Sequence, residues 1–178
     1  MRVSTQTGVG LIEVMVAVLL LSVAVLGFSA LQLRAISATD ESLIRTQTLS
    51  IIRGLAENMR ANAQEIDTYK ETINDTTTSY VTCTGGCTAE EIAINEAKTA
   101  YDRLSSHGVT MSMVTCPGTA NFSQVMCIIA AWGDTKAQLD RLPDPEVEED
   151  EGDIDAQACA NEDGIYKNGS TCIIVETY

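Results

Sequence analysis

Residues 14–33 read VMVAVLLLSVAVLGFSALQL, and this stretch decides the fold of the N-terminal part of the chain. It holds no charged side chain, and Glu13 and Arg34 bracket it. A helix rises about 1.5 Å per residue, so a helix of this length crosses the roughly 30 Å apolar core of a bilayer. The sequence therefore predicts one membrane-spanning helix near the N-terminus. From about Arg34 onward the chain is polar and typical of a soluble domain.

The charge of the chain argues against several classes of partner and activity. The 178 residues include 25 acidic and 11 basic side chains, which gives a formal net charge of −14. Nucleic-acid phosphates and anionic lipid headgroups both require clustered Lys and Arg, so we expect neither as a surface ligand. The sequence holds no G-x-S-x-G, P-loop or G-x-G-x-x-G motif. We therefore expect no enzyme activity and no cofactor.

Six cysteines follow the apolar stretch, and an even number in a small exported domain indicates a disulfide framework. Six cysteines allow fifteen pairings, so connectivity does not follow rigorously from the sequence. Proximity favours pairing each cysteine with its neighbour, as Cys83 with Cys87, Cys116 with Cys127 and Cys159 with Cys172. Three residues separate the first two cysteines, whereas thioredoxin-like redox sites have two. A structural link is therefore the favoured interpretation of that pair, and a redox role is the alternative.

The N-terminal residues MRVSTQTG do not form an ordinary secretory signal. They carry one positive charge, Arg2, and no A-x-A-like cleavage site follows the apolar run. The segment GVGLIEVMVAVLLLS, residues 8–22, instead resembles the class III signal of type IV pilins and type II secretion pseudopilins. The resemblance implies that a prepilin peptidase cleaves between Gly8 and Val9 and methylates the new amino terminus. The family usually has Phe where this chain has Val9.

The same resemblance makes Glu13 the fifth residue of the mature chain and suggests a role in assembly. A carboxylate near an apolar core costs on the order of 2.5–3.5 kcal/mol unless it is paired. In a fibre, the terminal amine of a neighbour's Val9 would offset that cost and fix the axial register. The alternative interpretation is an interfacial acid that flanks a membrane span.

The predicted long helix continues beyond the membrane segment and becomes amphipathic. Apolar and small residues recur at helical spacing of three and four: Ile44, Thr48, Ile51, Leu55, Met59 and Ala63. Charged residues occupy the other side of the helix: Asp40, Glu41, Arg45, Arg53 and Glu57. We therefore expect one helix over about residues 10–64, whose second half packs on a head domain.

The head is expected to combine one helix with an antiparallel sheet. Residues 65–87 are polar and are predicted to form a loop. Thr88 and Glu91 form a capping-box pattern, which predicts a helix from there to a stop at Gly108. Strands are predicted at 109–113, 124–132 and 172–178, the first two as a hairpin with Cys116 and Cys127 near its closed end. The fold class is therefore α+β, a pilin-like fold with a long N-terminal helix packed on an antiparallel sheet and a disulfide-bonded head.

Within the pilin family, the C-x-x-x-C segment followed at once by a capped helix is similar to PilV-type minor pilins, as is the run CIIAAWGD at residues 127–134. This implies a minor pilin that incorporates into, initiates or modifies a type IV pilus. Its implied partners are other minor and major pilins, the prepilin peptidase and the inner membrane, with the head in the periplasm and then at the cell surface. Alternatives are a type II secretion pseudopilin, a pilus-tip adhesion module and an anchored enzyme.

The resemblance implies four parts of the chain. These are a leader peptide at 1–8, a transmembrane and assembly helix at 9–34, an amphipathic half of the long helix at 35–64 and an extracytoplasmic head at 65–178.

Two further features of the sequence bear on metal binding. Residues 144–155, DPEVEEDEGDID, are rich in carboxylates and favour a solvated loop, with weak calcium binding as the alternative. His107 precedes the predicted helix stop at Gly108, where a cation complements the helix dipole. The thiols are expected to be used in disulfides, so no metal is predicted.

Overall fold

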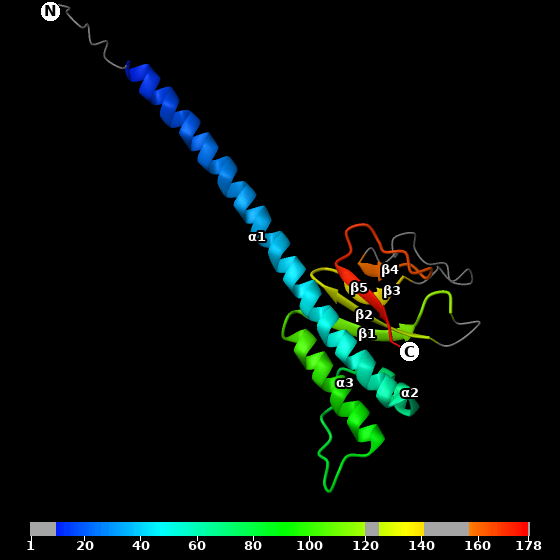
Figure 1. The fold of residues 1–178 in the computed structure, drawn as a ribbon. Helices are drawn as coiled ribbons and strands as arrows, with labels where there is room; N and C mark the ends of the chain where they lie inside the picture. The colour runs from blue at the N-terminus through cyan, green and yellow to red at the C-terminus, as the bar shows by residue number, and fades with distance from the viewer. Residues whose placement is uncertain (1–9, 120–124, 141–156, 178) are drawn as a thin grey trace, which may run out of the picture. The chain divides into compact units, whose positions relative to one another are not determined.

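A computed structural model of the chain describes residues 10–119, 125–140 and 157–177. The chain divides into two compact units, the first ending at Leu43 and the second beginning at Ile44. Helix α1 (Leu11–Ala61) contributes residues to both units (Figure 1). The second unit, called the head below, contains every other helix and strand of the described chain.

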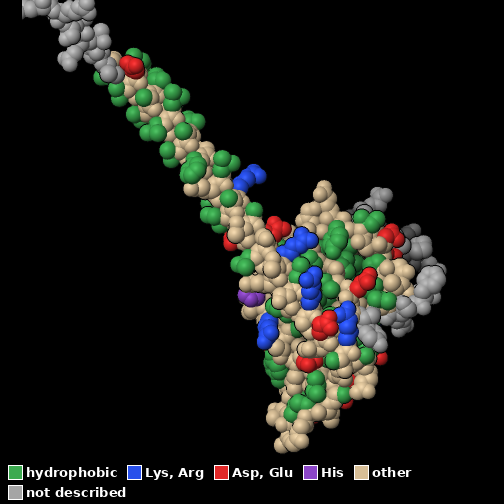
Figure 2. All heavy atoms as spheres, in the orientation of Figure 1, with side chains coloured by type: hydrophobic (Ala, Val, Ile, Leu, Met, Phe, Trp, Pro, Cys, Tyr) green, Lys and Arg blue, Asp and Glu red, His purple; other side chains and the backbone are tan. Residues whose placement is uncertain are grey.

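In the described part of the first unit, residues 11–43 form a single stretch of α1 whose side chains are all exposed (Figure 2). Among the described residues, α1 is the one helix long and apolar enough to cross a membrane, and none of its apolar window is buried. Its few hydroxyl groups bond within the helix: Ser22 donates to the Val18 carbonyl at 2.8 Å and Ser29 to the Val25 carbonyl at 2.9 Å. Because these hydroxyls already have acceptors, they do not require water.

Three helical elements cover one face of the sheet in the head. These are the last turns of α1, helix α2 (Ile66–Asn74), which follows a short 3₁₀ turn η1 (Ala63–Glu65), and helix α3 (Ala89–Ser105). The sheet is antiparallel, with strand order β1-β2-β5, and consists of β1 (Val109–Thr115), β2 (Met126–Trp132) and β5 (Cys172–Glu176). Side chains from all three helices and the sheet form one core, with Ile52, Met59 and Ile128 fully buried.

The other face of the sheet carries a smaller layer. Strands β3 (Lys136–Leu139) and β4 (Ala158–Ala160) form a two-stranded parallel sheet there. Ile129 and Ala131 of β2 pack against Cys159 and Cys172 in this layer. β2 is buried on both faces, which explains why its sequence is a continuous apolar run.

The structure confirms the α+β class with a long N-terminal helix and an antiparallel sheet. The capping box is present: Glu91 N–H donates to the Thr88 hydroxyl at 3.2 Å, and Thr88 N–H donates to the Glu91 carboxylate at 2.8 Å. Gly108 follows α3 with a φ of 70°, a left-handed value that favours glycine. β1, β2 and β5 lie where the three strands were predicted.

The structure pairs the cysteines as sequence proximity favours. The Cα atoms of Cys83 and Cys87 lie 4.9 Å apart. Those of Cys116 and Cys127 also lie 4.9 Å apart, and those of Cys159 and Cys172 lie 5.8 Å apart. The second disulfide lies near the closed end of the β1–β2 hairpin, and the third joins the two sheets.

The prediction of a loop over residues 65–87 was wrong in its first part, where α2 forms. Ile66, Tyr69 and Ile73 are spaced by three and four, and Tyr69 and Ile73 are fully or almost fully buried, so tertiary packing stabilises a helix of polar composition. α1 ends at Ala61, short of the predicted residue 64.

The packing of single residues also differs in places from the predicted stripes. In α1 the centre of the buried stripe is Ile52, whereas Ile51 is half-buried. Ile92, near the start of α3, is 39% exposed. β3 and β4 were not predicted.

The free edge of β1 is held by one side chain. The Asn74 amide donates to the Met113 carbonyl at 2.9 Å and accepts from the Met113 N–H at 2.9 Å. This pair of bonds joins the end of α2 to β1 and satisfies backbone groups that an edge strand otherwise leaves open.

We expect Asn74→Ala to lower the free energy of unfolding by about 1–3 kcal/mol, because it removes both partners of the Met113 peptide groups. Urea unfolding of the full chain in detergent measures this, with Asn168→Ala in an exposed turn as the control. Equal stability of the two variants would contradict the assignment.

Candidate assembly surfaces

Glu13 lies in the first turn of α1, next to uncovered apolar side chains. The Glu13 N–H donates to the Gly10 carbonyl at 3.0 Å as the helix begins. The Glu13 side chain borders a shallow hollow of about 280 Å³ whose other walls are apolar: Val14, Ala17, Val18 and Leu21. A carboxylate here is favoured by the helix dipole but opposed by an apolar environment. Gly8 and Val9 lie outside the described residues.

Small residues follow Glu13 along the helix at the spacing of a packing seam. Ala17, Ala24 and Gly27 fall on the same four-then-three repeat, with Leu20 and Leu31 between and after them. A Cβ built on Gly27 would meet no atom within 4 Å. A second helix can therefore approach α1 closely on this side.

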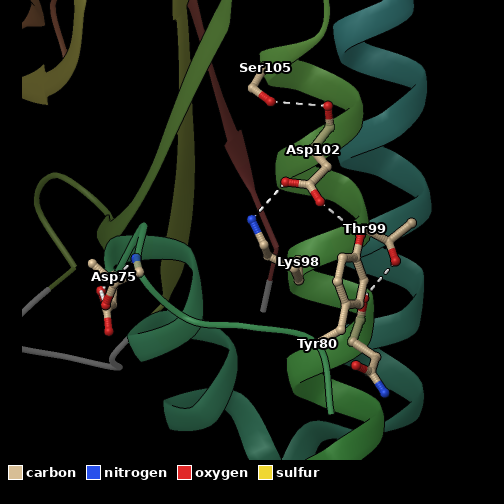
Figure 3. Close-up of polar contacts among 8 residues, drawn as sticks. Asp75, Tyr80, Lys98, Thr99, Asp102 and Ser105 are labelled. Carbon is tan, nitrogen blue, oxygen red and sulfur yellow. Dashed lines mark hydrogen bonds and ion pairs between the residues drawn. The ribbon is translucent and has the colours of Figure 1, made fainter. Parts of the chain in front are cut away.

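On the head, the segment between α2 and α3 is fastened along α3 (Figure 3). The Tyr80 hydroxyl donates to the Asp102 carboxylate at 2.9 Å, and Lys98 pairs with the same carboxylate at 2.7 Å. Asn95 holds the Val81 peptide from both sides, with two hydrogen bonds of 2.9 Å. The disulfide of Cys83 and Cys87 closes the end of this segment.

The contact between Lys98 and Asp102 shifts the pKa of both side chains. Hydrogen bonds from Lys98 and then from Tyr80 hold the pKa of Asp102 below its usual value. The hydrogen bond to Asp102 raises the pKa of Lys98. Both groups therefore stay charged over the neutral range.

A second set of polar contacts joins α2 to α3 and the end of α1 to the start of α3. Tyr69 of α2 is fully buried, and its hydroxyl donates to the Glu96 carboxylate of α3. Burial, followed by this hydrogen bond, raises the pKa of Tyr69. At the end of α1, the Asn62 amide donates to the Ala89 carbonyl at 2.8 Å.

Sequence reasoning did not identify Asn62, Tyr69, Asn74 or Asn95. In the sequence, each of these residues is marked only as a polar or amphipathic side chain at the end or on the inner face of a helical segment. Which backbone group each one would reach depends on the tertiary fold.

The candidate metal ligands do not form an open site. The ligand atoms of Cys83, Cys87 and Glu91 lie within 4.8 Å of one another, but both sulfur atoms belong to the disulfide and so offer no thiolate. His107 is exposed after the end of α3, and its backbone N–H donates to the Leu104 carbonyl at 3.0 Å. The acidic run at 144–155 lies outside the described residues, so calcium binding there stays an untested alternative.

Residues 30–104 match a family model described as Tt1218-like, type IV pilin Tt1218. The match begins within α1 and ends at the last turn of α3, so it covers the helices of the head and precedes the sheet. Over these residues the chain is similar to a type IV pilin. Comparisons with curated proteins and with solved structures found no match. Besides this match, helix α1 is long and apolar enough to cross a membrane.

The lowered pKa of Asp102 gives a pH dependence of stability with a defined sign. Ionised Asp102 stabilises the head fully above about pH 4, the ordinary Asp pKa, and this contribution is lost as the pH falls through the lowered pKa of the folded state. We expect Asp102→Asn to be less stable than the natural chain at pH 7 and the difference to shrink toward pH 3.

Urea unfolding of the full chain in detergent at the two pH values measures this difference. Asp134→Asn, an exposed carboxylate between β2 and β3, is the matched control. A stability difference for Asp102→Asn that is the same at both pH values would rule out the charged contact as its cause.

Proposed function

We propose that this type IV pilin-like chain is a minor pilin of the PilV type, which incorporates into a type IV pilus and initiates or modifies it. The single observation that carries the proposal is the fully exposed apolar half of α1 on a chain whose residues 30–104 match a type IV pilin model. A pilus core, or the inner membrane before assembly, would cover that helix. The chemistry of the protein is polymerisation through this helix and not catalysis.

Processing precedes assembly in this proposal. Prepilin peptidase cleaves between Gly8 and Val9 at the cytoplasmic side of the membrane and methylates the Val9 amine. The head then stands in the periplasm, an oxidising compartment in which disulfides form and persist. In the fibre, the subunit contacts other minor and major pilins.

In this proposal, Glu13 fixes the axial offset between the α1 helices of neighbouring subunits. Its carboxylate is the one charged group at the start of an otherwise apolar helix in the described chain, and the terminal amine of a neighbouring subunit is its expected partner. An apolar interface has little positional preference along the helix axis, so a single buried ion pair can select one axial offset.

The N-terminal peptide of the natively expressed chain tests the processing step by mass spectrometry, in membranes and in sheared surface material. We expect a chain that starts at a methylated Val9 and is present in the sheared fraction. An intact Met1 in cells with active prepilin peptidase would overturn the proposal. Correct processing without sheared surface material would instead favour a secretion pseudopilin.

We expect Glu13→Ala to be cleaved normally but to appear in sheared fibres at no more than about a tenth of the natural amount, the effect of roughly 1.4 kcal/mol of lost pairing. Quantitative immunoblots of membrane and sheared fractions measure this ratio. Glu57→Ala, which removes an exposed acid elsewhere on α1, is the control and should incorporate normally. Normal incorporation of Glu13→Ala would remove Glu13 from the assembly mechanism.

A further inference from the structure

A groove runs between α1 and α3 on the surface of the head. One hollow of about 430 Å³ is bordered by residues from Ser50 to Asn58 of α1 and from Asn95 to Arg103 of α3. A second hollow, of about 330 Å³, continues toward the start of α3 and shares Asn58 and Glu96 with the first. Together they make one groove that follows both helices for about three turns.

The walls of the groove suit another helix. Small residues border it, namely Gly54, Ala61, Ala89 and Ala100, and a Cβ built on Gly54 would meet no atom within 4 Å. Ile51 and Ile92 add partly exposed apolar surface. Small side chains allow two helix backbones to approach closely, so the groove has the form of an unfilled third-helix position.

The charges of the groove indicate which helix would fit. Glu96 already accepts the Tyr69 hydrogen bond. Arg103 borders the groove near Ser50, is exposed and has no ionic partner among the described residues. An entering helix that places a carboxylate at this end would pair with Arg103.

The chain itself carries a helix surface with these properties. Ile36, Asp40 and Leu43 are spaced by four and three on α1, so they share one face. Ile36 and Leu43 are 58% and 54% exposed, and Asp40 between them is also exposed. This face, called the stem face below, thus presents two uncovered apolar side chains with one carboxylate between them.

We propose that the α1–α3 groove of one copy binds the stem face of a second copy, with Asp40 of the second copy paired to Arg103. The match has three parts: an apolar side chain next to Asp40 on the stem face meets Ile51, small residues allow close helix approach, and Asp40 meets Arg103 at one end of the groove. The contact rests on the proposed function, since it requires copies to meet in one membrane or fibre.

The two surfaces of this contact differ, which has a consequence for assembly. A contact between unlike surfaces leaves one groove and one stem face free at the ends of any pair. A pair of copies therefore keeps one free groove and one free stem face, where other pilins take the next places. A symmetric dimer contact would stop at two.

Photocrosslinking in the full-length chain tests the contact directly. A benzophenone amino acid replaces Ser50 at the Arg103 end of the groove, and two differently tagged copies are expressed together in piliated cells. We expect a crosslinked species that carries both tags, and mass spectrometry should locate the partner in the tryptic peptide 35–45. Crosslinks to a different pilin, or to another part of the second copy, would overturn the proposal.

Charge reversal supplies the matched variants. Asp40→Lys should lower the crosslink yield about fivefold. Glu41→Lys makes the same charge change on the neighbouring residue, which points about 100° away around the helix, and should leave the yield unchanged. Combining Asp40→Arg with Arg103→Asp should restore the yield. Equal losses for Asp40→Lys and Glu41→Lys would overturn the pairing.

Gly54→Leu tests the groove without touching the core, since the added side chain enters open space. Gly54→Leu should abolish the crosslink, while the chain unfolds at the same urea concentration as the natural chain or at a higher one. Arg53→Leu, next to the groove, should leave the crosslink yield unchanged. An unchanged yield with Gly54→Leu would overturn the proposal. A chain present in sheared fibres without the 35–45 crosslink would refute this contact and leave the pilus function standing. A 35–45 crosslink in cells whose sheared fibres lack the chain would support this contact and refute the pilus function.

Discussion

The rest of the molecule depends on one constraint, which is that the first half of α1 has apolar side chains on every face and nothing in the described chain that covers them. Burial of one Leu or Val side chain contributes about 1.5–3 kcal/mol, so many such side chains exposed to water would be costly. The hydroxyls of Ser22 and Ser29 are already bonded to carbonyls of their own helix. Lipid or the helices of other subunits can therefore surround this segment without leaving those hydroxyl groups unsatisfied. Glu13 differs from them because its carboxylate would need a partner in an apolar environment.

The edges of the three-stranded sheet in the head carry side-chain contacts that limit strand pairing with other chains. Edge strands offer unpaired peptide groups to other chains, and both edges of the three-stranded sheet carry side-chain partners. Asn74 holds Met113 on β1, and the Tyr166 hydroxyl accepts from the Ile174 N–H on β5 at 3.0 Å. Gly164 lies close to Pro117, where an added Cβ would come within 3.2 Å of the proline ring, so the C-terminal loop packs tightly on the hairpin turn.

The sequence was sufficient for the elements whose local signals agree with the tertiary fold. The apolar run, the stripe that includes Leu55 and Met59, the capping box at Thr88 and the alternation in β1 each predicted the element that forms. α2 was missed because its nine residues are mostly polar and its three apolar side chains gain their stability only by packing on the head. β3 and β4 are short and flank a long acidic segment, so no periodicity marked them.

The polar contacts of the candidate surfaces were less accessible to sequence reasoning for a different reason. Glu13 stands out because it interrupts an apolar sequence, which is a local pattern. Asn95 and Asp102 are ordinary polar residues of an amphipathic helix, and their roles depend on a segment that begins more than ten residues earlier in the chain. The groove between α1 and α3 is a property of two helices packed together, so no pattern in either helix alone predicts it.

Affinity and specificity in such a subunit have separate physical sources. Apolar burial along α1 is strong but non-directional, and it changes little when one helix slides along another. A charge pair at the rim of an interface adds little affinity but penalises wrong registers and wrong partners. A fibre subunit therefore needs few charged contacts, provided that each stands beside apolar surface that has already excluded water. Glu13 beside Ala17, and Asp40 between Ile36 and Leu43, have this arrangement, whereas Glu57 pairs with Arg60 on its own helix and is left with no such role.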